Sequence, residues 1–317
     1  MAEPRTLPEL MEAVRAFQES RVLLSALELD VLDACGNGAT AAAVAGSIGA
    51  DPRATGMLLD ALAALGVLVK RDGHYRCTGA GAALARERAG MLHMAHLWHT
   101  WSALSECVRS GRPAQAGPPG GQVQDFMAAM HARAQSFTGE AVRRVGVQGV
   151  RRLLDVGGGP AAFAIAFAQA EPGLSADVLD LAPVQPIAEA HIRAAGLADR
   201  VRVRVGDLRR DDLGEGYDLV LVSAICHMLG EAENRDLLSR CARALAPGGR
   251  VAIREFILEP DRAGPPRSAL FALNMLVGTE HGNAYTEAEY RGWMEQAGLG
   301  AIVRPDPGGD WMIGRKG

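Results

Sequence analysis

The chain has 317 residues, a formal net charge of −4, 48% hydrophobic residues and 22% charged residues. This length accommodates two domains with buried cores. The acidic balance gives no reason to expect nucleic acid or an anionic membrane as a partner, and no apolar run is long enough to span a bilayer. The start of the chain lacks a basic segment followed by an apolar core, and the five cysteines form no CxxC pair. We therefore expect a cytoplasmic protein without a secretion signal, a disulfide framework or a metal site.

The first part of the chain has the pattern of a small helical domain. An apolar stripe from Leu23 to Val31 predicts one helix that ends at Gly36. Two shorter helices follow, and an Asp51-Pro52 cap starts the second of them. Asp72-Gly73 then marks the turn of a β-hairpin. Three helices followed by a hairpin predict a winged helix.

Winged helices often bind DNA, but this one lacks the charge for it. The helix in the recognition position, residues 51–65, carries Arg53 as its only basic residue. Residues 1–90 contain nine arginines and lysines against eleven acidic residues, a net charge of about −2. Because phosphate neutralisation dominates DNA affinity, we expect residues 1–90 to form a dimerisation domain instead.

Residues 91–150 are predicted to bridge this domain to the rest of the chain and to contribute to the substrate pocket. Helical patterns cover residues 91–110 and 125–145, and a Gly/Pro-rich loop at 111–122 separates them.

From residue 151 onward, strand and helix patterns alternate, which is typical of a doubly wound parallel sheet. The last two strands, 301–306 and 309–315, are predicted to form an antiparallel pair. The other predicted strands are 152–156, 175–181, 201–208, 217–227 and 249–258, and the predicted helices are 160–170, 184–195, 231–245 and 286–297. The fold class is therefore α/β, a Rossmann-like domain at 151–317 behind a mostly helical domain.

The segment "LLDVGGGPAAFAIAFA" at 153–168 predicts a strand, a tight turn and the start of a helix. Gly157, Gly159 and Ala162 satisfy the dinucleotide spacing G-x-G-x-x-A. Asp155, however, would repel a pyrophosphate at the helix start and would attract the α-ammonium group of a methionine moiety.

Further acidic residues follow the next two strands. Asp180 suits the ribose hydroxyls of a nucleoside, because a carboxylate accepts two hydrogen bonds from a vicinal diol. Asp207 can accept from the exocyclic amine of adenine, with Leu208 against the ring. The role of Asp180 suits both NAD and S-adenosylmethionine, and Asp155 is the residue that separates the two and favours S-adenosylmethionine over a dinucleotide.

Four segments resemble the successive motifs of class I methyltransferases: "LLDVGGG" (153–159), "VLDL" (178–181), "GDL" (206–208) and "ALAPGGRVAI" (244–253). With its winged-helix front end, the chain resembles the dimeric small-molecule O-methyltransferases of the plant caffeate and bacterial antibiotic-tailoring type. The resemblance implies S-adenosylmethionine as methyl donor, S-adenosylhomocysteine as product, and a homodimer through interlocking N-terminal domains. The expected cofactor-binding residues are Asp155, Gly157, Gly159, Asp180, Leu181, Asp207, Leu208 and Ser223.

The expected catalytic residues are His227 and Glu255. A histidine base suits a hydroxyl acceptor, and "SAICH" places His227 just beyond the fourth strand, as in the resembling family. Glu255 matches the acid that orients this histidine. The chain departs from the family at Met228, where an acid is usual, and at Ala284, where a second orienting acid falls. The candidates to replace this second acid are Glu280 and His281.

A structural role for His227, as a hydrogen-bonding residue, stays open at this point. His93, His96 and His99 lie along one predicted helix, but no carboxylate at matching spacing favours a metal site there.

Aromatic and methionine side chains predict a pocket for a flat, apolar acceptor. The helical segment at 269–282 has no polar face, and in the resembling family this helix covers the acceptor. The expected substrate-binding residues are Trp98, Trp101, Phe126, Met130, Phe271, Asn274 and Met275.

The function that these features favour is O-methylation of a small aromatic or polyketide-like metabolite. N- or C-methylation, or another S-adenosylmethionine-dependent reaction, is an alternative on the same scaffold. A cofactor-sensing regulator with a winged-helix output is a third, and the acidic balance of residues 1–90 argues against it.

Overall fold

The structure is a computed structural model that describes residues 4–114 and 122–317. The chain divides into two compact units, Glu3–His99 and Thr100–Gly317. The boundary between them falls inside the segment 91–150 that the sequence assigns to bridging helices. The division into 1–90, 91–150 and 151–317 stays a prediction, and most of the predicted Gly/Pro loop at 111–122 lies outside the described residues.

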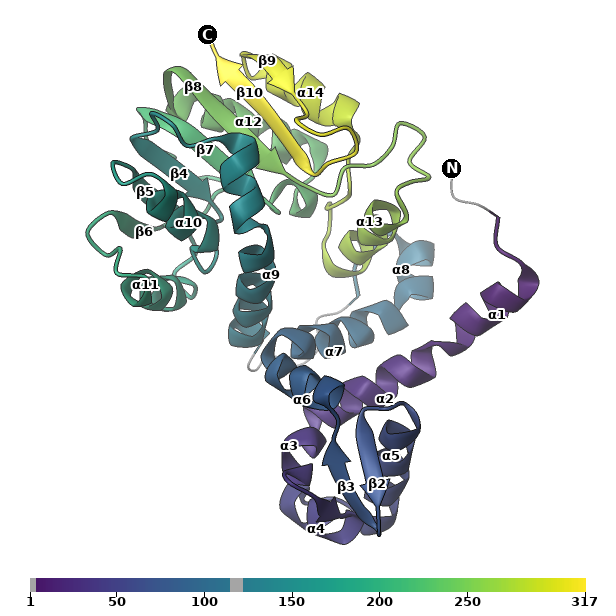
Figure 1. The fold of residues 1–317 in the computed structure, drawn as a ribbon. Helices are drawn as coiled ribbons and strands as arrows, with labels where there is room; N and C mark the ends of the chain where they lie inside the picture. Colours follow the sequence, from purple (N-terminus) through teal and green to yellow (C-terminus); the bar gives the residue numbers. More distant parts are fainter. Residues whose placement is uncertain (1–3, 115–121) are drawn as a thin grey trace. The chain divides into compact units, whose positions relative to one another are not determined.

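The N-terminal unit contains helices and a three-stranded sheet of order β1-β3-β2 (Figure 1). Asp51 accepts a hydrogen bond from the backbone N–H of Ala54 at 2.8 Å, which confirms the predicted helix cap. Asp72 and Gly73 both have positive φ, as a two-residue hairpin turn requires. The elements are α1 (Leu7–Arg15), α2 (Phe17–Glu28), α3 (Val31–Cys35), β1 (Ala39–Thr40), α4 (Ala41–Ile48), α5 (Pro52–Ala64), β2 (Leu68–Arg71), β3 (His74–Cys77) and α6 (Gly79–Arg86).

Two predicted helices are interrupted. The stripe from Leu23 to Val31 does not form one helix, because Asp30 has φ 55° and separates α2 from α3. Aspartate tolerates this left-handed conformation better than most residues, since its short polar side chain bonds locally. The predicted helix at 91–110 is divided at Ala103 into α7 (Arg88–Ser102) and α8 (Leu104–Ser110).

The C-terminal unit is built on a seven-stranded sheet of order β6-β5-β4-β7-β8-β10-β9. The strands from β6 to β8 are parallel, and β10 runs antiparallel to both of its neighbours, which confirms the predicted topology. The strands are β4 (Arg152–Val156), β5 (Ser175–Asp180), β6 (Val201–Val205), β7 (Tyr217–Ser223), β8 (Leu245–Arg254), β9 (Leu299–Val303) and β10 (Trp311–Lys316).

Some predicted strand limits are wrong at their carboxyl ends. The strand predicted at 217–227 ends at Ser223, because Ala224 has φ 60° and turns the chain into a short 3₁₀ turn, η1 (Cys226–Met228). The helices of this unit are α8, α9 (Gln122–Val145), α10 (Ala162–Ala170), α11 (Gln185–Ala194), α12 (Glu231–Ala244), α13 (Pro266–Gly278) and α14 (Glu287–Gln296).

Alternate residues of the central strands face opposite sides of the sheet. Leu219 and Leu221 of β7 pack in a core with α9, α10 and α11. Val220 and Val222 pack in a second core with α12 and α14. Figure 1 shows these two helical layers on either side of the sheet. Each fully buried aliphatic side chain contributes about 1.5–3 kcal/mol to the free energy of unfolding, so both layers are strongly held.

In the sheet, β5 and β6 lie on one side of β4, whereas β7, which comes next along the chain, lies on the other side of β4. Such a reversal of strand order opens a crevice at the carboxyl ends of the strands, where ligands bind in open α/β sheets. Among the described residues, no helix has both the length and the apolar character needed to cross a bilayer.

Candidate active site

The loop between β4 and α10 packs against its neighbours without space for side chains. Gly157 has φ 65°, and a Cβ atom there would lie 2.3 Å from Cδ1 of Ile225. A Cβ atom at Gly158 would lie 2.6 Å from Cγ of Asp155. The glycines therefore bring the backbone of this loop close to the ends of β4 and β7, as a site that binds a ligand by close backbone approach requires.

Asp155, at the end of β4, is 1% exposed. Neither of its carboxylate oxygens has a hydrogen-bond partner among the described residues. Burial raises the pKa of Asp155 to about 7, although the nearby backbone N–H of Ala164 opposes the shift, and the Asp180 carboxylate adds a smaller increase. A buried carboxylate without a partner is costly, so its presence at the ligand edge of the sheet favours a cationic group of a ligand as its partner.

Asp180, at the end of β5, is held in one orientation by two backbone N–H groups. Its Oδ2 accepts from Gly159 at 2.8 Å, and its Oδ1 accepts from Leu181 at 2.7 Å. Burial raises the pKa of Asp180 above its ordinary value. Each oxygen retains a lone pair, so the group can accept two hydrogen bonds from a diol. The apolar side chain of Leu181 is exposed beside it.

Asp207 and Leu208 lie in the loop that follows β6. Asp207 already accepts a hydrogen bond from the backbone N–H of Arg209 at 2.9 Å and forms an ion pair with Arg210 at 3.5 Å. The carbonyl of Leu208 accepts from Arg240 on α12 at 2.6 Å. The side chain of Leu208 points to the glycine loop, 3.2 Å from the position of a Cβ atom at Gly157.

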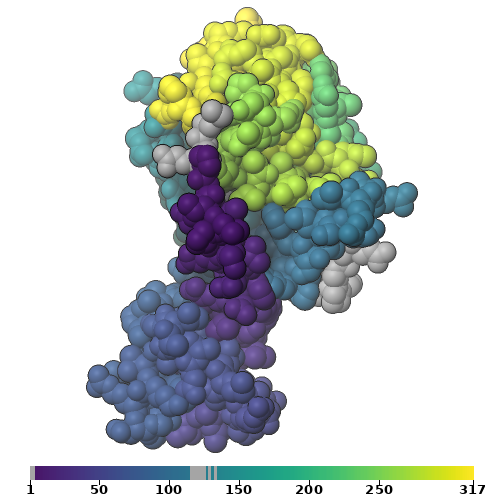
Figure 2. Space-filling view, turned by 90° about the vertical axis from the view of Figure 1, so that its right-hand side faces the viewer, coloured from purple at the N-terminus to yellow at the C-terminus, as the bar shows by residue number. Residues whose placement is uncertain are grey.

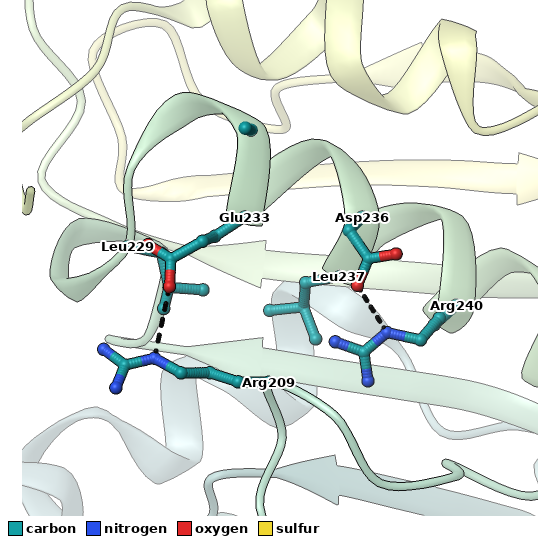
Figure 3. Close-up of a pocket in the computed structure, with 7 residues that line it drawn as sticks. Arg209, Leu229, Glu233, Asp236, Leu237 and Arg240 are labelled. Atoms are coloured by element: carbon teal, nitrogen blue, oxygen red, sulfur yellow. Dashed lines mark hydrogen bonds and ion pairs between the residues drawn. The ribbon is translucent and has the colours of Figure 1, made fainter.

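A cavity of about 290 Å³ lies between this loop and α12 (Figure 3). Arg209 of the loop reaches Glu233 on α12 at 3.4 Å and so joins the loop to the helix, whereas Arg240 pairs with Asp236 at 2.7 Å within α12. The predicted site residues are absent from the described residues that line it. The cavity therefore lies where the loop contacts α12 and is separate from the predicted ligand site.

His227 lies in the turn η1 and contacts the carboxylate that follows β8. Nδ1 of His227 is 2.8 Å from Oε2 of Glu255, and both side chains are buried. Oε1 of Glu255 also accepts from the backbone N–H of His227 at 3.3 Å. A carboxylate at Nδ1 fixes the proton on that nitrogen and leaves the lone pair of Nε2 available for a substrate proton.

Aromatic rings cover the other side of this histidine. Phe271 on α13 lies perpendicular to the imidazole of His227, with ring centroids 4.7 Å apart. Phe271 stacks on Phe256 at 3.7 Å and an interplanar angle of 13°. One turn along α13, the amide oxygen of Asn274 accepts from Nε1 of Trp101 at 2.8 Å. These contacts form a rigid apolar wall next to the histidine.

The remaining predicted pocket residues are distributed over three places. Phe126 and Met130 are described on α9, and both are at least partly exposed. Met275 on α13 is buried. Trp98 belongs to the N-terminal unit, where its ring packs against Phe17 and Arg21.

No second carboxylate reaches His227 in the part of the chain that the structure describes. Ala284 is fully buried, whereas Glu280 and His281 are exposed and neither bonds to the imidazole. Among the described residues there is also no cluster of three or more side chains that could hold a metal ion.

Sequence reasoning missed two buried groups near the histidine, Asn234 and Tyr285. A signal was present for the first: Asn234 precedes Leu237 and Leu238 on the apolar face of α12, which indicates a buried amide.

Comparison with known families identifies the family of the chain. A family model described as an O-methyltransferase domain matches residues 118–300, more than half of the chain. The chain belongs to the O-methyltransferase family. A second family model, an O-methyltransferase dimerisation domain, matches residues 11–87 of this O-methyltransferase. The resemblance drawn from the sequence motifs is thereby confirmed.

Individual relatives support the same assignment over nearly the whole chain. A 3-hydroxy-5-methyl-1-naphthoate 3-O-methyltransferase from Streptomyces sahachiroi is 34% identical, over 92% of this chain and 89% of the relative. A tetracenomycin polyketide synthesis 8-O-methyltransferase from Streptomyces glaucescens is 30% identical, over 97% and 96% of the two chains. Human N-acetylserotonin methyltransferase, solved in complex with S-adenosylmethionine, is 26% identical with a TM-score of 0.83 and full coverage of both chains.

The O-methyltransferase uses S-adenosylmethionine as its cofactor. The residues at the sheet edge fit this group: Asp155 offers an unpartnered buried carboxylate, Asp180 an oriented carboxylate with free lone pairs, and Gly157 a close backbone approach.

Proposed function

We propose that this O-methyltransferase methylates a hydroxyl group of a small aromatic or polyketide-like metabolite, with His227 as general base and Glu255 as the residue that orients it. The observation that supports this most strongly is the 2.8 Å contact between Nδ1 of His227 and Glu255 in a buried setting. Methylation of a neutral nitrogen does not require such a base at the acceptor.

When bound, S-adenosylmethionine supplies an electrophilic methyl group. The task left to the protein is to align the acceptor and to remove its proton. Nε2 of His227 takes the proton of the hydroxyl group as the oxygen gains the methyl group. Glu255 stabilises the imidazolium that forms, because its carboxylate accepts the Nδ1 hydrogen bond. A phenol has a pKa of about 10, so a histidine base is well matched to it near neutral pH.

We assign the cofactor contacts residue by residue. Asp155 would hold the α-ammonium group, and Asp180 the ribose hydroxyls. Backbone approach at the glycine loop would seat the methionine moiety. The buried hydroxyl of Ser223, which has no partner among the described residues, supports a polar contact at the end of β7. The full proposed set is Asp155, Gly157, Gly159, Asp180, Leu181, Asp207, Leu208 and Ser223.

The acceptor is expected to be flat. The stacked Phe256 and Phe271 provide a planar wall beside His227, and Trp101 orients the amide of Asn274 at its edge. The relatives that act on a hydroxynaphthoate and on a tetracenomycin polyketide support a fused aromatic ring with a hydroxyl group as the acceptor class. We include Trp98, Phe126, Met130 and Met275 as further pocket residues.

We also propose a homodimer through the N-terminal domain, without nucleic acid or membrane as partner. The matched dimerisation domain supports it. A stripe on α1 and the start of α2 supports it further, because its large apolar side chains are exposed within their own unit: Leu7, Leu10, Met11, Val14 and Phe17.

The test compares two histidine variants on a panel of hydroxynaphthoates and simpler phenols. We expect His227→Gln to lower kcat by about a hundredfold or more, the usual size of a lost general base. His281→Gln serves as the matched control, because His281 is exposed and bonds neither to Glu255 nor to His227, and it should keep full activity. Calorimetric titration with S-adenosylhomocysteine should give unchanged affinity for both.

Asp180→Ala tests the cofactor assignment separately. We expect its affinity for S-adenosylhomocysteine to fall by about tenfold or more, because two hydrogen bonds to a charged acceptor are lost. Full turnover of a hydroxyl acceptor by His227→Gln would contradict the base, and binding without turnover of any hydroxyl acceptor would favour N- or C-methylation or a sensing role.

A further inference from the structure

We propose that Asn234 and Tyr285 are positioning residues that fix the turn of His227 by holding the backbone carbonyls on both sides of it. This inference rests on the proposed function, in which His227 is the base. Neither residue touches the imidazole, so any effect on catalysis would pass through the backbone of η1.

Asn234 contributes two of the hydrogen bonds. It lies in the first half of α12 and is fully buried. Its Nδ2 group donates to the carbonyl of Cys226 at 2.9 Å and to the carbonyl of Leu229 at 3.2 Å. Cys226 precedes His227 and Leu229 follows the turn, so one side-chain amide ties together the two ends of the turn.

Tyr285 holds the same turn from another element. Its hydroxyl donates to the carbonyl of Leu229 at 2.6 Å, and its ring packs against Trp293 with centroids 4.8 Å apart. The segment that carries Tyr285 also approaches His227 itself: the backbone N–H of Asn283 donates to the carbonyl of His227 at 2.9 Å. A Cβ atom at Gly282 would lie 2.4 Å from that carbonyl oxygen, so this approach requires glycine.

The turn needs such support at its carbonyl groups because it is short and follows a strained residue. It has three residues, and it follows Ala224, whose φ of 60° is unfavourable for alanine. Glu255 is the one carboxylate that bonds the ring in the described part of the chain. Glu255 bonds the ring at Nδ1 and also the backbone N–H of His227, and these two bonds leave the carbonyl groups of the turn free to rotate about the carboxylate. The hydrogen bonds at Cys226, His227 and Leu229 remove that freedom and so fix the direction of Nε2.

The chain provides a matched pair of tyrosines for the test. Tyr290 belongs to the same aromatic cluster as Tyr285 and is fully buried, but its hydroxyl has no hydrogen-bond partner among the described residues. Tyr285→Phe and Tyr290→Phe therefore delete the same atom from the same cluster, and only the first deletion removes a hydrogen bond to the turn. Asn234→Ser, which keeps one short donor, provides a second variant that preserves the fold.

The experiment measures kcat, KM, the affinity for S-adenosylhomocysteine, and the ¹⁵N and ¹H signals of the imidazole in ¹⁵N-histidine-labelled protein. The Nδ1–H signal of His227 is assigned by its absence from His227→Gln, since the chain has only eight histidines. We expect Tyr285→Phe and Asn234→Ser to lower kcat by about tenfold, as small misplacements of catalytic groups do, with KM and cofactor affinity within about twofold of wild type. The Nδ1–H signal should broaden or shift in both, and Tyr290→Phe should match wild type.

Two results would overturn the inference. One is a Tyr285→Phe variant with the kcat and the Nδ1–H signal of Tyr290→Phe. The other is loss of kcat with an undisturbed Nδ1–H signal, because the effect would then not pass through the orientation of His227. Failure of the proposed function would be recognised by a different result, namely full turnover of a hydroxyl acceptor by the His227→Gln variant. The imidazole signals still report in that case whether Asn234 and Tyr285 hold the ring.

Discussion

Asp155 carries a carboxyl group that the fold buries one strand away from Asp180, with no hydrogen-bond partner among the described residues. Because burial raises its pKa to about 7, the folded chain keeps a proton on Asp155 at pH values where the unfolded chain, with a pKa of about 3.9, has released it. The free energy of unfolding therefore falls as pH rises from about 4 to about 7 and is constant above. A bound cationic group stabilises the ionised carboxylate of Asp155 and so offsets this loss of stability.

Cofactor affinity should accordingly depend on pH. Between pH 6 and pH 8 we expect the affinity for S-adenosylhomocysteine to rise by about tenfold, because a group of pKa about 7 must lose its proton before it pairs with the ammonium. Titration calorimetry measures this. Asp155→Asn should flatten the dependence, and 5′-methylthioadenosine, which has no ammonium group, should show none with wild type. A pH-dependent affinity of equal size for methylthioadenosine would assign the titration to another group, such as Asp180.

For single residues, the sequence predicts the contacts that strand order fixes. It does not predict the contacts that depend on how a loop folds or how deeply a helix packs. His227 and Glu255 come after β7 and β8, which are adjacent parallel strands, so their proximity is a consequence of strand order. The bonds of Asp207 to Arg209 and Arg210 depend on how one loop folds on itself. The bonds of Asn234 depend on the depth at which α12 packs. No pattern along the chain encodes either of these.

Among the elements, the glycine loop after β4 combines two requirements that most glycines meet singly. Gly157 has positive φ and also lies where a Cβ atom would collide with Ile225. Gly196, after α11, has a similar φ of 69° but open space around it. The sequence motif identifies Gly157 by spacing alone, and only the structure separates its conformational role from its packing role.

This pair of glycines makes a controlled test. Gly196→Ala should lose about 1 kcal/mol of stability, measured by urea unfolding, from the left-handed backbone, and Gly157→Ala should lose more because of its additional collision with Ile225. Gly157→Ala should in addition weaken S-adenosylhomocysteine binding by about tenfold or more, because the loop must move away from the crevice to relieve the collision. Equal cofactor affinity in the two variants would mean that close packing at this loop is unimportant for binding.

Element type and order in the C-terminal unit were predictable and element limits were less so, whereas α1, β1 and α6 of the N-terminal unit were not predicted. The continuous apolar run of β7 and the cap at Asp51 are local features that the sequence carries in full. The break at Asp30 is different, because the apolar stripe continues through it. Hydrophobic periodicity reports which side chains are buried and does not report a change in helix direction between them.

At the scale of the whole molecule, the N-terminal unit presents more apolar surface than it can cover. No residue of α1 is buried, and Val14 is 74% exposed. In the space-filling view, the purple α1 extends away from the rest of its own unit (Figure 2). Its exposed side chains recur at helical spacing, which is typical of a helix that packs against another chain.

We expect the double variant Leu10→Glu/Val14→Glu to be monomeric in sedimentation velocity at concentrations where wild type is a dimer, because each glutamate would be buried without a partner at the interface. Val303→Glu is the control: Val303 is exposed on β9, in the other unit, and its substitution should leave the dimer intact. A dimeric double variant would place the interface elsewhere.

The segment that holds the carbonyl of His227 follows directly on α13, the helix that carries Phe271 and Asn274. The proposed acceptor wall and the segment that holds the backbone of His227 are therefore neighbours along one stretch of backbone. We therefore expect a mutation in α13 that admits a new acceptor to disturb His227 as well, and we expect mutations at Phe126 and Met130 on α9 to disturb it least. Libraries aimed at new acceptors should begin there and leave α13 intact.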